Sequence, residues 1–336
     1  MGGGPWSSTH AGVHRLLRIR SLLPQGVTGL VAVSGGQDSV CLLKLLVDLQ
    51  PKWGWRLQVV HCDHRWRPDS AANADFVQDL CERWGVACQV VVADADYPTE
   101  AAARQWRYQV FETLAHQGNR THVVTGHTAS DRAETLLYNL LRGSGPDGLQ
   151  ALAWQRPLAP ASPTTVVRPL LALTRQQTGE FCRQFDLPIW SDSTNQDTRY
   201  ARNRIRLELL PYLQEHFNPG VEATLATTAE LLVAEVELLE TMAADLYDQV
   251  VQPVQGEDPW RMARSPLSSA PLALQRRVLR RVLGQVTTAQ VSFAQVEKLV
   301  ALLTAPNGSR SDPFPGGLMA VVEGEGVVFR GGDGGG

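Results

Sequence analysis

Residues 29–40 read GLVAVSGGQDSV. The first five form an uninterrupted apolar run, which predicts a buried strand, and residues 39–49 carry apolar side chains at helical spacing. The two adjacent glycines between them allow a tight turn that presents backbone N–H groups. A strand, such a turn and a helix N-terminus together form a cradle for phosphate. The loop lacks the lysine and the spacing of a Walker A loop, and its residues would also suit an ordinary turn that caps a helix.

Strands and helices alternate on the C-terminal side of this loop. The pattern predicts strands at 57–61, 87–93 and 121–126, and helices at 71–84, 100–116 and 131–142. Short connections between alternating strands and helices indicate a parallel sheet covered on both faces. The fold class is therefore α/β, a doubly wound parallel sheet, followed by a smaller and mainly helical C-terminal domain. Ligands of such sheets bind at the carboxyl ends of the strands.

The second half of the chain is less regular. It is expected to hold a loop with one short hairpin at 143–169, a helix at 174–185 capped by Thr174, a polar turn at 192–195, a charged segment at 199–210, a break at 217–220, a long acidic helix at 221–247, helices at 271–283 and 291–303, and a strand pair at 318–322 and 326–329. We therefore expect an N-terminal helical arm (1–25), a main domain (26–216) and a C-terminal domain (217–336).

Composition excludes several classes of protein. The chain has 336 residues, of which 43% are hydrophobic and 19% charged, so it is neither disordered nor collagen-like. No apolar run approaches the ~18 residues of a membrane span. A formal net charge of −3 excludes a globally basic RNA binder, so any RNA surface is a local patch. Five cysteines without a C-x-x-C pair argue against disulfides, zinc and iron–sulfur sites, and favour a reduced, cytoplasmic protein.

Asp38 stands out within the glycine-rich loop. A carboxylate beside bound phosphate would repel it unless Mg²⁺ lies between them, which makes Asp38 the first candidate metal ligand. A strand that ends in SGGxDS resembles the PP-loop (N-type) ATP pyrophosphatase superfamily, whose members cleave ATP to AMP and pyrophosphate.

Six further segments, in order, are similar to the family of tRNA(Ile)-lysidine synthetases over about residues 26–210. They are VHCDH at 60–64, EAAAR at 100–104 with RY at 107–108, GHTASDRAET at 126–135, RPLL at 168–171, DSTN at 192–195 and NRIR at 203–206. The C-terminal third is only loosely similar to the tRNA-binding region of that family.

The resemblance implies an ATP-dependent ligase that joins free lysine to C2 of the wobble cytidine of a tRNA(Ile) with a CAU anticodon. The cytidine would first be adenylated, and the product, lysidine, would pair with A and change codon reading from AUG to AUA. ATP and Mg²⁺ are the expected cofactors, and tRNA(Ile) and lysine are the expected partners. The family also allows a homodimer.

Carried onto this sequence, the resemblance implies two sets of site residues. The nucleotide would contact Ser34, Gly35, Gly36, Gln37, Asp38, Ser39 and His61. The catalytic set would be Asp38, Arg104, His127, Asp131 and Glu134, with Asp38 and Asp131 on the metal.

The chemistry fits these residue types. Asp131 and Glu134 are three residues apart and share a helix face, so their carboxylates can hold Mg²⁺, bind the amino groups of lysine or accept the proton of its ε-amine. Arg104 can neutralise the phosphate of AMP or pyrophosphate. The alternative is an acidic helix start with a surface arginine. The family usually has two acidic residues at 130 and 131, whereas this chain has Ser130, which shifts the expected metal role to Asp131.

Two groups of arginines are candidate tRNA contacts. The first comprises Arg199, Arg202, Arg204 and Arg206, and the second comprises Arg276 and Arg280. Clustered guanidinium groups suit an RNA backbone, although a solvated charged helix face has the same pattern.

Two other functions stay open at the level of sequence. A PP-loop tRNA thiolase would use the same adenylation with sulfur as the nucleophile, and would need a reactive cysteine. A non-catalytic module that binds RNA or nucleotides would retain the loop without the chemistry.

Overall fold

A computed structural model of the chain describes residues 6–191, 197–252, 260–287 and 289–331. The chain divides into two compact units, Met1–Val233 and Ala234–Gly336. This division falls inside the long helix α10 (Val221–Val250), so each unit includes part of that helix. The domain boundaries expected from the sequence, after residues 25 and 216, stay predictions.

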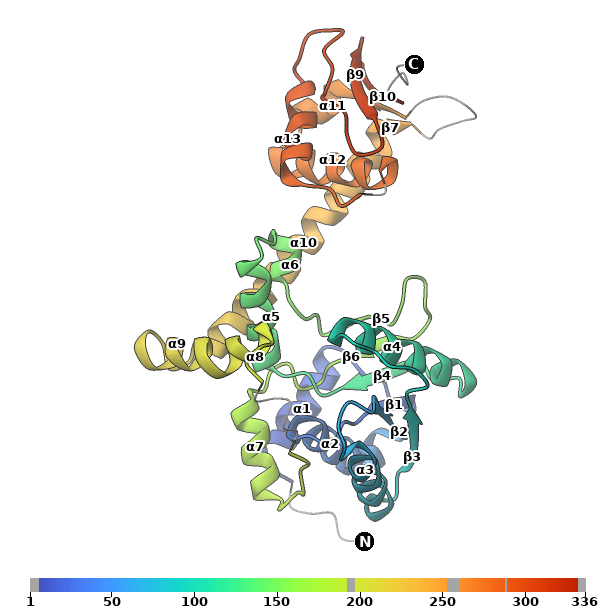
Figure 1. The fold of residues 1–336 in the computed structure, drawn as a ribbon, viewed down its shortest axis with the longest axis vertical. Coiled ribbons are helices and arrows are strands. Elements are labelled where there is room, and N and C mark those ends of the chain that lie inside the picture. Colours follow the sequence, from blue (N-terminus) through green and yellow to red (C-terminus); the bar gives the residue numbers. More distant parts are fainter. Residues whose placement is uncertain (1–5, 192–196, 253–259, 288, 332–336) are drawn as a thin grey trace. The chain divides into compact units, whose positions relative to one another are not determined.

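The first unit is built on a six-stranded sheet with the order β3-β2-β1-β4-β6-β5 (Figure 1). Its strands are β1 (Thr28–Ala32), β2 (Arg56–Asp63), β3 (Ala87–Val92), β4 (His122–Thr125), β5 (Gln155–Pro157) and β6 (Thr165–Val167). Neighbouring strands are parallel, except for the antiparallel edge pair β5 and β6. The predicted doubly wound parallel sheet is confirmed. Chain order reverses between β1 and β4, where such sheets bind their ligands.

Helices cover both faces of this sheet. One face carries α1 (Ser8–Ile19), α2 (Gln37–Trp53), α3 (Ser70–Trp84) and α7 (Arg175–Gln184), and the other carries α4 (Glu100–Gln117). Side chains along a strand point alternately to the two faces, so Val31 belongs to the first core and Leu30 to the second. The expected N-cap of α7 is confirmed, because Thr174 Oγ1 accepts a hydrogen bond from Gln177 N.

The segment 143–169 contributes more to the sheet than expected. It contains the short helix α6 (Pro146–Leu149) and the predicted hairpin, formed by β5 and β6. In addition, Val166 of β6 pairs with Val123 of β4. A strand of three residues is too short to show a period, so its place in the sheet could not be predicted.

The charged segment 199–210 lies beside α5 (Ala129–Leu141). It folds into α8 (Ala201–Arg204) and the π-helical turn η2 (Ile205–Leu209), followed by α9 (Leu210–His216). Leu137, Ile205 and Leu210 form a small apolar core between these elements. The predicted polar turn at 192–195 lies outside the described residues. Helix α10 begins directly after the predicted break at 217–220.

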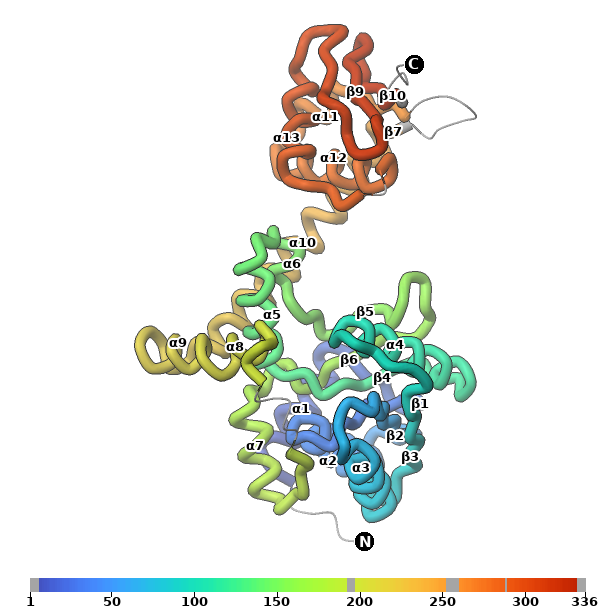
Figure 2. Tube along the Cα trace, in the orientation of Figure 1, coloured from blue at the N-terminus to red at the C-terminus, as the bar shows by residue number. Residues whose placement is uncertain are grey.

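The second unit, whose chain is traced in Figure 2, combines helices with a small sheet. Its helices are α11 (Arg264–Ser269), α12 (Leu272–Val286) and α13 (Phe293–Leu302), and its strands are β7 (Val251–Gln252), β8 (Arg261–Ala263), β9 (Leu318–Glu323) and β10 (Gly326–Gly331). The predicted pair β9–β10 is confirmed, and β8 and β7 extend it in the order β7-β8-β10-β9. Across the described ranges, no helix has both the length and the apolar character that a membrane crossing requires.

Gly126 allows the carboxyl end of β4 to approach the N-terminus of α2. A Cβ at this position would lie 3.0 Å from Asp38 O and 3.2 Å from Ser39 Cα. Both are backbone atoms of the helix that follows the glycine-rich loop, so they cannot rotate away. The close approach brings the residues after β4 next to that loop.

We expect Gly126→Ala to lower the free energy of unfolding by ~1–3 kcal/mol, because overpacking forces backbone atoms apart. Urea denaturation followed by circular dichroism measures the change. Gly12→Ala is the matched control, since a Cβ at Gly12 in α1 meets nothing within 4 Å; it should stabilise the chain by up to ~1 kcal/mol. Equal stabilities for both variants would contradict this account.

Candidate active site

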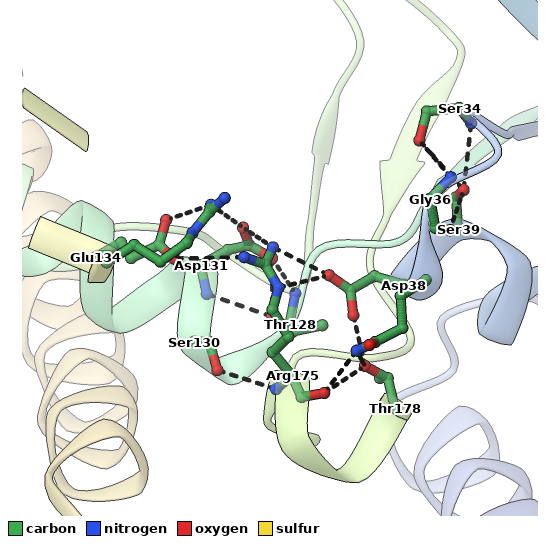
Figure 3. A network of polar contacts seen from close by, with 12 residues as sticks. Ser34, Gly36, Asp38, Ser39, Thr128, Ser130, Asp131, Glu134, Arg175 and Thr178 are labelled. Atoms are coloured by element: carbon green, nitrogen blue, oxygen red, sulfur yellow. Dashed lines mark hydrogen bonds and ion pairs between the residues drawn. The ribbon is translucent and has the colours of Figure 1, made fainter. Parts of the chain in front are cut away.

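The loop between β1 and α2 places backbone donors at a helix N-terminus. Gly36 is the N-cap of α2 and makes no side-chain capping bond, so the first N–H groups of the helix can bind an anion. Ser39 Oγ accepts from Ser34 N over 3.2 Å, and Ser34 Oγ accepts from Gly36 N over 3.4 Å (Figure 3). The two hydroxyl groups therefore lie at the same helix end as the backbone donors.

Gly35 has to be glycine for two reasons. Its φ of +89° lies in the left-handed region, and a Cβ there would lie 2.6 Å from Asn73 Oδ1. Asn73 Nδ2 donates to the Ser34 carbonyl over 3.1 Å, and Trp190 N donates to the Gly35 carbonyl over 2.9 Å. The conformation of the loop is thus held by α3 on one side and by the segment after α7 on the other.

Asp38 points toward α7. Its Oδ1 accepts from Thr178 Oγ1 over 2.5 Å, and its Oδ2 accepts from Arg175 Nε over 3.0 Å. Gln37, which was expected to contact the nucleotide, donates through Nε2 to the Arg175 carbonyl over 2.7 Å and to Thr178 Oγ1 over 2.9 Å. These bonds hold the start of α7 against the start of α2.

Asp131 and Glu134 lie in the first turns of α5, as expected. Asp131 Oδ2 accepts from both the backbone N and the Oγ1 of Thr128, each over 2.8 Å, which completes a capping box. Its Oδ1 has no hydrogen bond to a described residue and faces arginines at 3.6–4.0 Å. Glu134 is buried, and it accepts from Arg206 Nε over 2.6 Å and from Nη2 over 2.8 Å.

Arg175, Arg202 and Arg206 join the three carboxylates into one network. Figure 3 shows Arg175 between Asp38 on one side and Asp131 and Glu134 on the other. Arg175 reaches Asp38 at 3.0 Å, Asp131 at 3.6 Å and Glu134 at 3.9 Å. Arg202 Nε lies 3.4 Å from Glu134 Oε2. The carboxylates come from α2 and α5 and the arginines from α7, α8 and η2, so this edge of the sheet collects residues that are distant in the sequence.

Arg175 was missed in the sequence, although one signal pointed to it. It is the first residue of α7, where the helix dipole disfavours a positive charge. An arginine at this position is expected to have a compensating negative partner, and here it has three.

Burial and neighbouring charges shift the pKa values of Asp131 and Arg175 in opposite directions. Burial alone would raise the pKa of Asp131, but His127, Arg175 and the Thr128 N–H outweigh it and hold this pKa below its usual range. Burial also opposes the charge of Arg175, yet the nearby carboxylates raise its pKa. Asp131 and Arg175 are therefore both ionised at neutral pH.

His127 follows β4 and is neutral at pH 7. Burial lowers its pKa to about 3, and the positive charges of Arg168, Arg104 and Arg202 act in the same direction against Asp131. Its Nδ1 lies 2.9 Å from Thr125 Oγ1. A neutral imidazole here can exchange hydrogen bonds without adding charge to a cluster that already has several arginines.

The hydroxyl of Ser130 is hydrogen-bonded to α7 and α10. Its Oγ accepts from Arg175 N over 3.0 Å and donates to a carboxylate oxygen of Glu222, at the start of α10. In this chain, position 130 thus links α5, α7 and α10.

Arg104 and His61 lie around the same edge of the sheet. Arg104 Nη2 donates to Tyr108 Oη over 3.1 Å, and its guanidinium stacks on that ring at 4.7 Å. His61 is buried at the end of β2, and its Nδ1–H donates to the Val33 carbonyl over 2.8 Å. His61 therefore supports the residue that precedes the glycine-rich loop.

The first group of arginines is divided by the structure. Arg202 and Arg206 face Glu134, whereas Arg204 is exposed and Arg199 is paired with Asp197 in solvent. In the second unit, Arg276 pairs with Glu297 at 2.7 Å, and Arg280 lies 4.0 Å from Glu240. Only part of the predicted RNA patch therefore faces solvent.

The site offers a divalent cation two carboxylate ligands, Asp38 and Asp131, rather than a complete set of protein ligands. Within the described ranges, no group of three or more His, Cys, Asp or Glu side chains has the spacing of a metal site. Asp38 and Asp131 nevertheless lie 3.0 and 3.6 Å from the same nitrogen, Arg175 Nη2, so one positive charge already reaches both. Mg²⁺ is commonly held by one or two carboxylates together with substrate phosphates, and these two residues fit that role.

Comparisons with known proteins identify the family of both parts of the chain. Residues 16–213 match the family model described as PP-loop domain, and residues 263–325 match the model described as TilS substrate binding domain. The first match contains every carboxylate and arginine of the network.

Two curated relatives are similar over nearly the whole chain, and both are tRNA(Ile)-lysidine synthases. The protein from a Nostoc strain is 54% identical, with 98% of each chain covered. The protein from Thermosynechococcus vestitus is 51% identical, with 93% of this chain and 89% of the relative covered. Among solved structures, the U34-tRNA thiolase NcsA from Methanococcus maripaludis aligns with a TM-score of 0.57 at 15% identity, over 67% of this chain and 78% of that one. This last likeness concerns the fold alone.

The lowered pKa of the half-buried His127 predicts a pH dependence of stability. Its folded pKa of about 3 lies below the ~6.5 of an unfolded histidine, so the unfolded chain binds the extra proton first. The associated stability is present above pH ~6.5 and is lost as the pH falls, by up to ~1.4 kcal/mol per pH unit. We expect His127→Gln to reduce the slope of the free energy of unfolding against pH, measured by urea titrations between pH 6 and 4.5, by up to ~1.4 kcal/mol per pH unit. His116→Gln, on the exposed surface of α4, should leave it unchanged; parallel curves for His127→Gln and the wild type would contradict the assignment.

Proposed function

The chain belongs to the family of tRNA(Ile)-lysidine synthases, and from that premise we propose that it joins free lysine to C2 of the wobble cytidine of a tRNA(Ile) with a CAU anticodon. The reaction uses ATP, which is cleaved to AMP and pyrophosphate. The observation that carries the proposal is the network itself: a phosphate-binding helix end and three carboxylates meet at one edge of the sheet.

In the first step, the cytidine O2 attacks the α-phosphate of ATP and pyrophosphate leaves. The N–H groups at the start of α2 and the hydroxyls of Ser34 and Ser39 bind the departing phosphates. Arg104 stabilises the negative charge that develops there. Bound Mg²⁺, held by Asp38 and Asp131, would supply further positive charge beside the phosphates.

In the second step, the ε-ammonium of lysine gives up a proton to water, the resulting amine attacks C2, and the C2–O2 bond breaks so that AMP leaves with the oxygen. After pyrophosphate has left, Asp131 Oδ1, which has no hydrogen bond to a described residue, would be available to accept one from the amine. Its lowered pKa keeps it charged, so it suits the binding and orientation of an ammonium group. Glu134 holds Arg206 and Arg202 beside it, and the neutral His127 adds a hydrogen-bonding group without charge.

The surroundings of the site suit a tRNA. Arg199 and Arg204 are the two members of the first arginine group that face solvent, and we propose them as contacts to the phosphate backbone. Within the second unit, we propose Arg276 and Arg280 as a separate set of phosphate contacts. The five free cysteines favour a reducing, cytoplasmic compartment. The resemblance also allows a homodimer, which sedimentation of the purified chain would reveal.

The buried thiols count against the thiolase alternative. Cys41, Cys81 and Cys182 are buried, and burial raises the pKa of Cys62 to about 12. A thiol with a raised pKa is a poor nucleophile. A non-catalytic module is also disfavoured, because it would have no need for three carboxylates in one buried network.

Incorporation of labelled lysine into tRNA transcripts tests the reaction directly. With ATP and Mg²⁺ present, we expect label in the CAU-containing tRNA(Ile) and none in the methionine tRNAs that share its anticodon. AMP release that depends on a sulfur donor would instead favour the thiolase. If no AMP formed under either condition, the binding module would be the remaining function.

Asp38→Asn tests the role of the loop carboxylate. We expect tRNA-dependent AMP release to fall by at least ~100-fold, the order of loss seen when one preorganised electrostatic group is removed from an active site. Asp79→Asn, on the exposed surface of α3, is the control and should keep wild-type activity. Circular dichroism of both variants shows whether the fold is retained, and full activity of folded Asp38→Asn would remove Asp38 from the mechanism.

A further inference from the structure

A groove lies beside the network, between the end of α5 and the elements α8, η2 and α9. It encloses about 580 Å³, a size typical of ligand pockets. Its walls include Tyr138, Arg142, Arg204, Glu208, Leu209 and Tyr212. The proposed reaction uses none of them in its chemistry.

The groove exposes apolar and aromatic surface. Leu141 is 69% exposed and Tyr212 is 55% exposed. The ring of Tyr212 stacks against that of His216, with centroids 4.5 Å apart, and Phe217 lies next to it with 72% of its surface exposed. A cluster of exposed rings at a pocket mouth is typical of a binding surface, and flat rings suit a flat partner.

The charges of the groove favour a partner with phosphate groups. Arg142 and Arg204 are exposed, and neither forms an ion pair with any residue in the described ranges. Arg142 instead donates to Tyr138 Oη over 3.1 Å and stacks on that ring at 5.2 Å. Glu208 is the one carboxylate in the lining, so the two guanidinium groups leave a net positive charge. Aromatic faces combined with unpaired arginines are how proteins bind single-stranded RNA.

The groove is continuous with the reaction site along two helices. On α5, Tyr138 follows Glu134 by four residues, a distance of one helical turn or ~5.4 Å. On α8 and η2, Arg202 and Arg206 face Glu134, whereas Arg204 lines the groove. A nucleotide beside the reacting one could therefore span from one site to the other.

We propose that this groove binds an unpaired nucleobase of the tRNA, the adenosine that follows the wobble cytidine in the CAU anticodon. Its base stacks on Tyr212, and its flanking phosphates lie on Arg142 and Arg204. The identity of the RNA rests on the proposed function. The groove thus holds the anticodon loop open while the cytidine enters the reaction site.

A fluorescent transcript tests the stacking. The adenosine of the CAU anticodon is replaced by 2-aminopurine, and the full-length protein is titrated into it without ATP or lysine. We expect quenching with the wild type and with Tyr212→Phe, which keeps the ring. Tyr212→Ala should lose the quenching and bind about tenfold more weakly, the effect of losing one stacked base. ATP binding by Tyr212→Ala should stay at the wild-type level, which shows that the site is folded.

The salt dependence of binding tests the phosphate contact. Arg204→Ala should reduce the slope of log Kd against log salt concentration by about 1, whereas Arg83→Ala should not. Arg83 is the matched control, because it is exposed at the C-terminal end of α3, away from the carboxyl edge of the sheet.

Two results would overturn the inference. One is wild-type quenching and affinity in Tyr212→Ala together with an unchanged salt slope in Arg204→Ala. The other is a loss of self-association in Tyr212→Ala with unchanged tRNA binding, which would make the groove a contact between copies of the chain. Failure of the proposed function is separate, since it appears as absent lysine incorporation by the wild type while tRNA binding is still measured.

Discussion

Glu134 is buried on α5, and its carboxylate accepts two hydrogen bonds from Arg206, a residue 72 positions further along the chain. A carboxylate removed from water needs such a partner, because an unpaired buried charge costs several kcal/mol. Apolar contacts of Leu137 and Ile205 bring α5 and η2 together, and the ion pair sets which faces of the two helices meet. The position of η2 thus depends on the charge of Glu134 near the start of α5.

The other carboxylates at this edge of the sheet also have positively charged partners. Arg175 lies between Asp38 and Asp131, so three carboxylates are matched by three guanidinium groups. A positive group that enters, whether a metal ion or an ammonium group, competes with a guanidinium that is already there. Phosphates at the start of α2 would attract the arginines and free the carboxylates. If nucleotide and cation bind as proposed, electrostatics would link the two binding events.

The short helical segment formed by α8 and η2 presents its arginines on two different faces. Arg202 and Arg206 point to the network, whereas Arg204, between them in sequence, lines the groove with Tyr138 and Tyr212. A π-helical turn, which is frequent at functional sites, continues this face toward α9. One short segment thus pairs with the carboxylate network on one side and, on the other, lines the groove that we propose as an RNA-binding surface.

Local sequence patterns were sufficient to predict those features that depend on residues close together in the sequence. The loop at 34–39, the parallel strands around it and the positions of Asp131 and Glu134 on one helix face follow from spacing over a few residues. Arg175 and the inward direction of Arg206 did not follow, because their partners lie 137 and 72 positions away. The hairpin of β5 and β6 was predicted, but its place in the sheet was not, since strands of three residues show no period and only pairing with β4 decides that place. The sequence by itself determined the fold class, the phosphate loop and the residue types of the site. Only the tertiary structure decided which arginine meets which carboxylate, because burial of charge is a property of packed elements and not of any single segment.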